Sequence, residues 1–257
     1  VKYPFKKFFK FEKEGEYNII LKFLNQMKNC SKMFYDCKYI TKIDLSSFDT
    51  NNVTNMDEMF YGCSNLVNVD LSNLKTQNVN NMKGMFSGCS NVKNIDLSSF
   101  DTKNVIDMSY MFFDCRKIIK LDLSKFDTIS VTDMSYMFGQ YESLKKLDLS
   151  SFNTVHVNDM THMFGLCSKM EHIDISSLNT EHVTNMGLMF FGCQSLIHID
   201  LSSFNTMDVI DMVSMFENCN SLTSIDLSSF ITNKVMDMSS MFNGCFSLTN
   251  INLSSFD

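Results

Sequence analysis

The sequence predicts an α/β solenoid of about nine stacked units, each 26 residues long. The phrase VTNMDEMFYGC at residues 53–63 returns every 26 residues with only some letters changed. A second phrase, typified by IDLSSF at residues 43–48, ends each unit, and a threonine recurs eight times between Thr50 and Thr232. A unit of this length cannot bury its own apolar face, so such repeats are typical of proteins in which neighbouring units stack.

The repeat divides the chain into two regions. Residues 1–26 do not match it, and we expect them to form an N-terminal cap or linker. Residues 27–257 follow the repeat and predict a single solenoid domain. The last residues stop inside a repeated phrase, so we expect the array to be truncated at its C-terminus.

The first half of each unit predicts a short helical or 3₁₀ segment. Val53, Met56, Met59, Phe60 and Cys63 are spaced so that they share one face of such a segment. An Asn or Asp always precedes the first methionine, where a short acceptor would cap exposed N–H groups. Some units carry a glycine just past this segment, where a positive φ is often needed. These glycines are Gly62, Gly88, Gly192 and Gly244; in two middle units the glycine stands one place earlier, at Gly139 and Gly165.

The second half of each unit predicts a short parallel strand. The apolar residues Leu66, Val69 and Leu71 follow the spacing L-x-x-L-x-L, and Val69 and Leu71 are expected to face inward. Strands of neighbouring units would then stack about 4.8 Å apart.

The unit IDLSSFDTKNVIDMSYMFFDC, residues 95–115, resembles the 26-residue leucine-rich repeat of BspA-like surface proteins, also described as a mycoplasma-lipoprotein type of repeat. The resemblance covers about residues 27–257. It implies a leucine-rich repeat solenoid in a family of mostly predicted surface proteins, for which adhesion or partner binding is the usual proposal. It implies no catalytic residues.

Nine cysteines raise the question of disulfide bonds or zinc. Eight of them form one column, spaced by 26 or 52 residues, in which Tyr141 takes the place of the missing member. Side chains in such a column point in parallel into the core and cannot converge on a zinc ion. We expect free, buried cysteines that act as small apolar residues.

An aspartate column is expected along the outer face of the strands. Like charges at one strand spacing repel by roughly 3 kcal/mol per pair at an effective dielectric of 20. Either the column attracts a cation or basic partner, or neighbouring polar side chains satisfy it and it orients the strands. Its members are Asp44, Asp70, Asp96, Asp122, Asp148, Asp174, Asp200 and Asp226.

Function is expected where an outward column departs from the repeat. The middle units carry aromatic or apolar residues at positions that are Glu58, Gly84, Ser214 and Ser240 in other units. Contiguous exposed aromatic residues tend to mark interaction sites. The other interpretation is that the rings lie down and cover methionine side chains. The predicted partner-binding residues are Tyr110, Tyr136, His162, Leu188, Phe113 and Phe191.

All five histidines lie in the middle units, but stacked pairs on different faces do not offer three convergent ligands, so we predict no metal site. No nucleophile–base pair or phosphate loop stands out, so we predict that the protein has no catalytic residues, binds no cofactor and is not an enzyme.

A net charge of −7 argues against nucleic acid as a partner. No run of 18 apolar residues predicts a transmembrane segment.

The sequence therefore favours a non-catalytic scaffold that binds a protein or glycan partner, or mediates adhesion, at the cell surface or in the extracellular space. The alternative is a structural assembly protein of a cell envelope or virion, with lateral self-association and a virion or cytoplasmic location.

Overall fold

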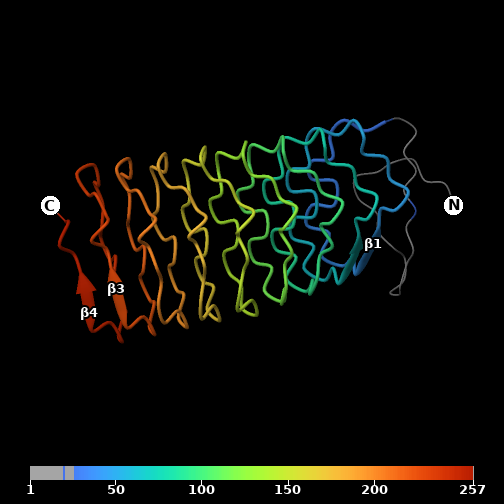
Figure 1. The fold of residues 1–257 in the computed structure, drawn as a ribbon. Coiled ribbons are helices and arrows are strands. Elements are labelled where there is room, and N and C mark those ends of the chain that lie inside the picture. The colour runs from blue at the N-terminus through green and yellow to red at the C-terminus, as the bar shows by residue number, and fades with distance from the viewer. Residues whose placement is uncertain (1–19, 21–25, 257) are drawn as a thin grey trace.

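The protein is an elongated solenoid. The computed structural model describes residue 20 and residues 26–256, and the chain coils along one axis from the blue to the red end of Figure 1. Within residues 26–256, eight isolated parallel bridges join residues one repeat apart, beginning with the pair Asn29 and Asn55 and ending with Asp211 and Asp237. The predicted solenoid is therefore confirmed. We call one 26-residue coil a rung.

Four short strands form two parallel pairs within the described residues. The strands β1 (Lys42–Asp44) and β2 (Asn68–Asp70) pair in parallel, as do β3 (Ser224–Asp226) and β4 (Asn250–Asn252). In β1 the two outer residues are exposed and the central isoleucine is buried, as the alternating pattern predicts. Within residues 26–256 no other segment forms a strand, so the expectation of a strand in every rung was too broad.

The predicted helical segment is instead a run of turns. The N–H groups of Met59, Tyr61 and Cys63 each donate to the carbonyl three residues earlier, at 3.1–3.2 Å. The intervening N–H groups, including that of Phe60, donate to carbonyls of the next rung. An α-helix needs negative φ throughout and N–H bonds to the fourth preceding carbonyl, and a 3₁₀-helix needs consecutive N–H bonds to the third. Because alternate N–H groups bond between rungs, no helix forms among the described residues.

Residues with a positive φ form two columns along the solenoid, with one member of each column in every described rung, and these residues shape the turns. One includes Gly62 and Gly88, with φ of 69° and 73°, which confirms the conformation predicted for these glycines and for Gly192 and Gly244. Non-glycine residues keep a positive φ at the same position in other rungs, as at Gln140 and Leu166. The earlier glycines, Gly139 and Gly165, therefore do not replace Gly62 in this conformational role.

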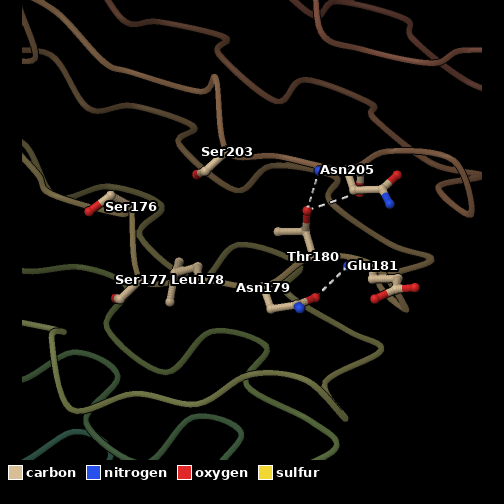
Figure 2. Close-up of a pocket in the computed structure, with 8 residues that line it drawn as sticks. All are labelled: Ser176, Ser177, Leu178, Asn179, Thr180, Glu181, Ser203 and Asn205. Atoms are coloured by element: carbon tan, nitrogen blue, oxygen red, sulfur yellow. Dashed lines mark hydrogen bonds between the residues drawn. The ribbon is translucent and has the colours of Figure 1, made fainter.

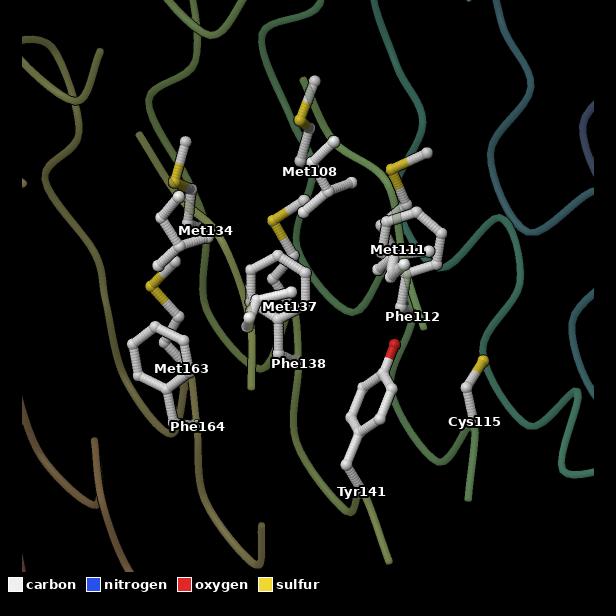
Figure 3. Close-up of a cluster of buried hydrophobic side chains, with 14 of the residues drawn as sticks. Met108, Met111, Phe112, Cys115, Met134, Met137, Phe138, Tyr141, Met163 and Phe164 are labelled. Atoms are coloured by element: carbon white, nitrogen blue, oxygen red, sulfur yellow. The ribbon is translucent and has the colours of Figure 1, made fainter. Parts of the chain in front are cut away.

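The core is built from the repeated apolar residues. Val53, Met56, Met59, Phe60 and Cys63 are fully buried, and the same positions stay buried in the following rungs up to Cys219 (Figure 3). In the rung that ends at Cys245, four of the five positions are only half-buried. Phenylalanines of neighbouring rungs stack with ring centroids 5.4–6.1 Å apart. The apolar columns thus form one continuous core along the solenoid axis.

The cysteines are free thiols, as predicted, and seven of the nine are buried. The Sγ of Cys63 lies 3.1 Å from the carbonyl of Phe34 and donates to it, and this bond recurs in other rungs. Burial raises the pKa of the Cys63 thiol to about 12. These thiols are therefore small core residues rather than nucleophiles.

Candidate functional site

The predicted partner-binding residues meet on the turn side of the middle rungs. Tyr110 stacks on Tyr136 with ring centroids 4.4 Å apart, and Tyr136 stacks on His162 at 4.6 Å. The ring of Phe113 meets Tyr110 and Tyr136 edge-on, at 5.5 and 5.9 Å. Phe191 lies 6.0 Å from His162. We call these five side chains the ring cluster; Leu188, the sixth predicted residue, follows His162 in the same column.

The ring cluster is less exposed than the sequence suggests. Tyr110, Phe113, Tyr136 and Phe191 are half-buried. His162 is only 7% exposed. Stacking explains the difference, because rings one rung apart cover each other's faces and leave mainly their edges to solvent. The Nζ of Lys83, which the sequence did not single out, lies 5.9 Å from the centre of the Tyr110 ring.

The backbone under the cluster is strained. Tyr110, Tyr136 and His162 have φ values of 58°, 59° and 54°, a region that costs a residue other than glycine about 1 kcal/mol. Gly84 occupies the same position in an earlier rung, with φ of 56°, so glycine is compatible with this turn. The middle rungs thus carry large rings at positions where glycine would relieve strain.

Two glycines make room for the rings. A Cβ added to Gly139 would lie 2.9 Å from the ring of Phe113, and one added to Gly165 would overlap the ring of His162. Neither of these glycines has a positive φ. Their shifted place in the sequence therefore reflects the space required by the rings above them.

The electrostatics of the cluster follow from burial. Desolvation, then the neighbouring Tyr136, raises the pKa of Tyr110 to about 12. Desolvation also lowers the pKa of His162, so its imidazole is neutral at pH 7. Beside the cluster, burial raises the pKa of Asp133, and the carboxylates of Asp107 and Asp159 one rung away add to the effect.

The outward aspartate column is satisfied locally. The Oδ1 of Asp122 accepts the N–H of Ser124 at 3.1 Å and its hydroxyl at 2.7 Å, and the N–H bond recurs at most members of the column. Hydrogen bonds from Ser124 lower the pKa of Asp122. This arrangement agrees with the interpretation of the column as a self-satisfied feature of the fold.

The other histidines do not join the cluster. His156, His172, His182 and His198 are all exposed. Within residue 20 and residues 26–256, no three His, Cys, Asp or Glu side chains are placed to hold a metal ion together.

A polar hollow of about 300 Å³ lies on another part of the solenoid (Figure 2). Its Thr180 Oγ1 accepts the N–H of Asn205 at 2.8 Å and donates to the carbonyl of the same residue at 2.9 Å. The Oδ1 of Asn179 accepts the N–H of Glu181 at 2.9 Å. Thr180 thus joins two rungs, and Asn179 shapes a turn within its own rung.

The fold and the ring cluster define a class of protein: a repeat solenoid with a cluster of stacked rings on its middle rungs. The family model described as "Mycoplasma protein of unknown function, DUF285" matches residues 28–140, 113–195 and 167–257. The chain belongs to this family, which confirms the resemblance to the mycoplasma type of repeat. No curated protein matches the sequence.

Solved structures of bacterial repeat proteins are similar over most of the chain. A leucine-rich cell surface protein from Faecalibacterium prausnitzii is 15% identical, covering 86% of this chain and 75% of its own, with a TM-score of 0.38. The Treponema pallidum leucine-rich repeat protein is 14% identical, covering 75% and 69%, with a TM-score of 0.35. A leucine-rich repeat protein from Bacteroides ovatus is 19% identical, covering 87% and 76%, with a TM-score of 0.28. The family assignment rests on the sequence match.

No helix in the described part of the chain is long and apolar enough to cross a membrane.

Proposed function

We propose that this protein is a non-catalytic scaffold that binds a protein partner through the ring cluster. The observation that carries the proposal is the set of stacked rings Tyr110, Tyr136 and His162, held on a backbone that favours glycine. Aromatic side chains that combine an apolar face with a polar edge are enriched in the centres of protein interfaces. A solenoid supplies the extended surface that such binding uses.

We place the scaffold at the cell surface or outside the cell, as an adhesion or capture module. The support is the resemblance of its repeat to that of BspA-like surface proteins. Protease treatment of intact source cells tests this placement. Digestion without lysis is the expected result, and protection until lysis would contradict a surface location.

The binding role is tested with the double variant Tyr110→Ala, Tyr136→Ala. The purified protein, immobilised as bait, is exposed to proteins from cells that live in contact with the source cell. We expect the double variant to lose at least 90% of the captured partner. Truncating an interface aromatic to alanine costs about 2 kcal/mol of binding free energy, which weakens the affinity about thirtyfold.

A second pair of stacked tyrosines supplies the control. The rings of Tyr35 and Tyr61 lie 4.8 Å apart in the first two rungs of the solenoid, away from the ring cluster. Tyr35→Ala, Tyr61→Ala should leave capture unchanged. Equal loss in both double variants would contradict a specific role for the ring cluster. A change in oligomeric state with capture intact would favour the alternative, a structural assembly protein.

A further inference from the structure

His162 occupies an unusual position in the ring cluster, over Gly165, which we call its seat. Its ring lies over Gly165, between Phe113 on one side and Phe191 on the other, with centroids 6.4 and 6.0 Å away. Its Nδ1 is buried and has no hydrogen-bond partner among the described residues. A buried nitrogen without a partner loses its hydration and gains no bond in return. The seat is therefore suited to the shape of the ring but poorly suited to a second proton.

We propose that His162 is a proton-operated switch of the ring cluster. The neutral ring occupies the seat over Gly165 and extends the stack of Tyr110 and Tyr136. The protonated ring leaves the seat for solvent and opens an apolar hollow between Phe113 and Phe191. As a regulator of partner capture, this switch rests on the function proposed above, and capture then weakens as the pH falls.

None of the charged side chains that the structure describes is placed to stabilise an imidazolium at this position. Tyr136 is the titratable side chain whose ring stacks on His162, while Gly139, Gly165, Leu188 and Phe191 supply no charge. Desolvation is the main effect on the pKa of His162, and no carboxylate or ammonium of the described residues contributes to it. Protonation therefore places a charge among aromatic rings with no counter-ion.

The pH dependence follows from this burial. An ordinary histidine has a pKa of about 6.5, and that of His162 is lowered in the folded protein. Between these two values the unfolded chain binds more protons than the folded chain. The stabilisation from the seated ring is therefore complete above about pH 6.5 and is lost as the pH falls towards the folded pKa.

The backbone allows the side chain to move alone. The N–H of His162 donates to the carbonyl of Gly187 in the next rung at 2.9 Å. The carbonyl of His162 accepts the N–H of Gly165 at 3.0 Å. Rotation of the side chain breaks neither bond, so the solenoid stays folded while the cluster opens.

The test follows the free protein by NMR with labelled histidine and tyrosine side chains, from about pH 8 to about pH 5, the range in which histidine titrates. His162→Gln assigns the His162 resonance. We expect His162 to titrate below pH 6.5, and the ring resonances of Tyr136 to shift with the same midpoint. A His162 midpoint at or above 6.5, or Tyr136 resonances that do not follow it, would overturn the proposal.

Gly165→Ala imitates the acid state at neutral pH. Its Cβ would occupy the seat, and alanine suits this backbone because φ is not positive at Gly165. We expect Tyr136 resonances at pH 8 close to those of the acidified wild type, and a His162 pKa restored towards its ordinary value. Glu217→Ala, at the equivalent position of a rung that carries Ser214 in place of His162, should change neither.

The two proposals can fail separately. The ring resonances are measured without a partner, so failure of capture in the double tyrosine variant leaves the switch standing. Ring movement accompanied by capture that does not change with pH would overturn the regulatory role alone. Should Gly165→Ala unfold, as its circular dichroism would show, the wild-type and His162→Gln titrations still decide the outcome.

Discussion

At the scale of single residues, Tyr141 is the clearest departure from the repeat. It stands where other rungs carry the column cysteine, and its side chain is fully buried among methionines and phenylalanines (Figure 3). A cysteine in this column donates its thiol to a phenylalanine carbonyl, as Cys167 does to Phe138 at 3.1 Å. The hydroxyl of Tyr141 has no hydrogen-bond partner among the described residues. The tyrosine thus fills the core but leaves one polar group unsatisfied.

We predict that Tyr141→Phe stabilises the protein. The substitution keeps the ring and removes the unsatisfied hydroxyl, whose burial costs about 1 kcal/mol or more. The free energy of unfolding should rise by about 1 kcal/mol in urea denaturation, with the slope against urea unchanged. Tyr39→Phe is the control, because Tyr39 is 94% exposed and its hydroxyl is hydrated. A loss of stability in Tyr141→Phe would show that the hydroxyl has a partner in solution, such as a buried water.

At the scale of elements, the rungs are held in register by a ladder of buried threonines. The Oγ1 of Thr128 donates to the carbonyl of Asn153 and accepts its N–H, both at 2.8 Å. The same pair of bonds recurs at Thr76, Thr102 and Thr154. One hydroxyl thus satisfies both backbone polar groups of one residue in the next rung, which explains why threonine recurs at this position.

We predict that Thr128→Val lowers the free energy of unfolding by about 2 kcal/mol. Valine has the same shape but leaves a buried N–H and a buried carbonyl without their bonds, each worth about 1 kcal/mol. Thr223→Val is the matched control, because Thr223 is exposed and makes one longer bond, of 3.4 Å, to Ile197. Urea denaturation of both variants measures the difference. Equal effects in the two variants would mean that the hydroxyl ladder does not set the register.

At the scale of the whole molecule, stacking makes one protected core with two ends. The column cysteines between the ends are buried, whereas Cys37 and Cys245, in rungs near the two ends, are only half-buried. Burial raises the pKa of the inner thiols, for example Cys167 to about 12. Little thiolate is therefore present at neutral pH, and reagents have little access to it.

We predict that a thiol reagent at pH 8 labels Cys37 and Cys245 first. The seven buried thiols should react only after the solenoid opens, so all nine should react quickly in denaturant. Mass spectrometry of peptides after a short pulse of labelling identifies the modified residues. Rapid labelling of Cys115 in the native protein would contradict a continuous, closed core.

Part of the candidate site could be predicted from the sequence. The six residues predicted to bind a partner stand out because they depart from the repeat, and the structure brings Tyr110, Tyr136 and His162 into one stack. Their burial could not be predicted, since it depends on rings covering each other across rungs. The sequence does contain one signal for the position of His162, the shift of two glycines to Gly139 and Gly165. That these glycines make room for rings can be recognised only once the structure places the rings.

The sequence by itself determined the period, the solenoid, the core columns and the family, because stacked units must repeat their apolar residues at the same positions. Only the tertiary structure decided how each rung turns. The spacing of Val53, Met56, Met59 and Phe60 suits a helix, yet alternate N–H groups bond to the next rung and two positions per rung take a positive φ. Bonds between rungs thus override the local helical pattern, because they satisfy the backbone with partners 25 residues away, which no local pattern can express.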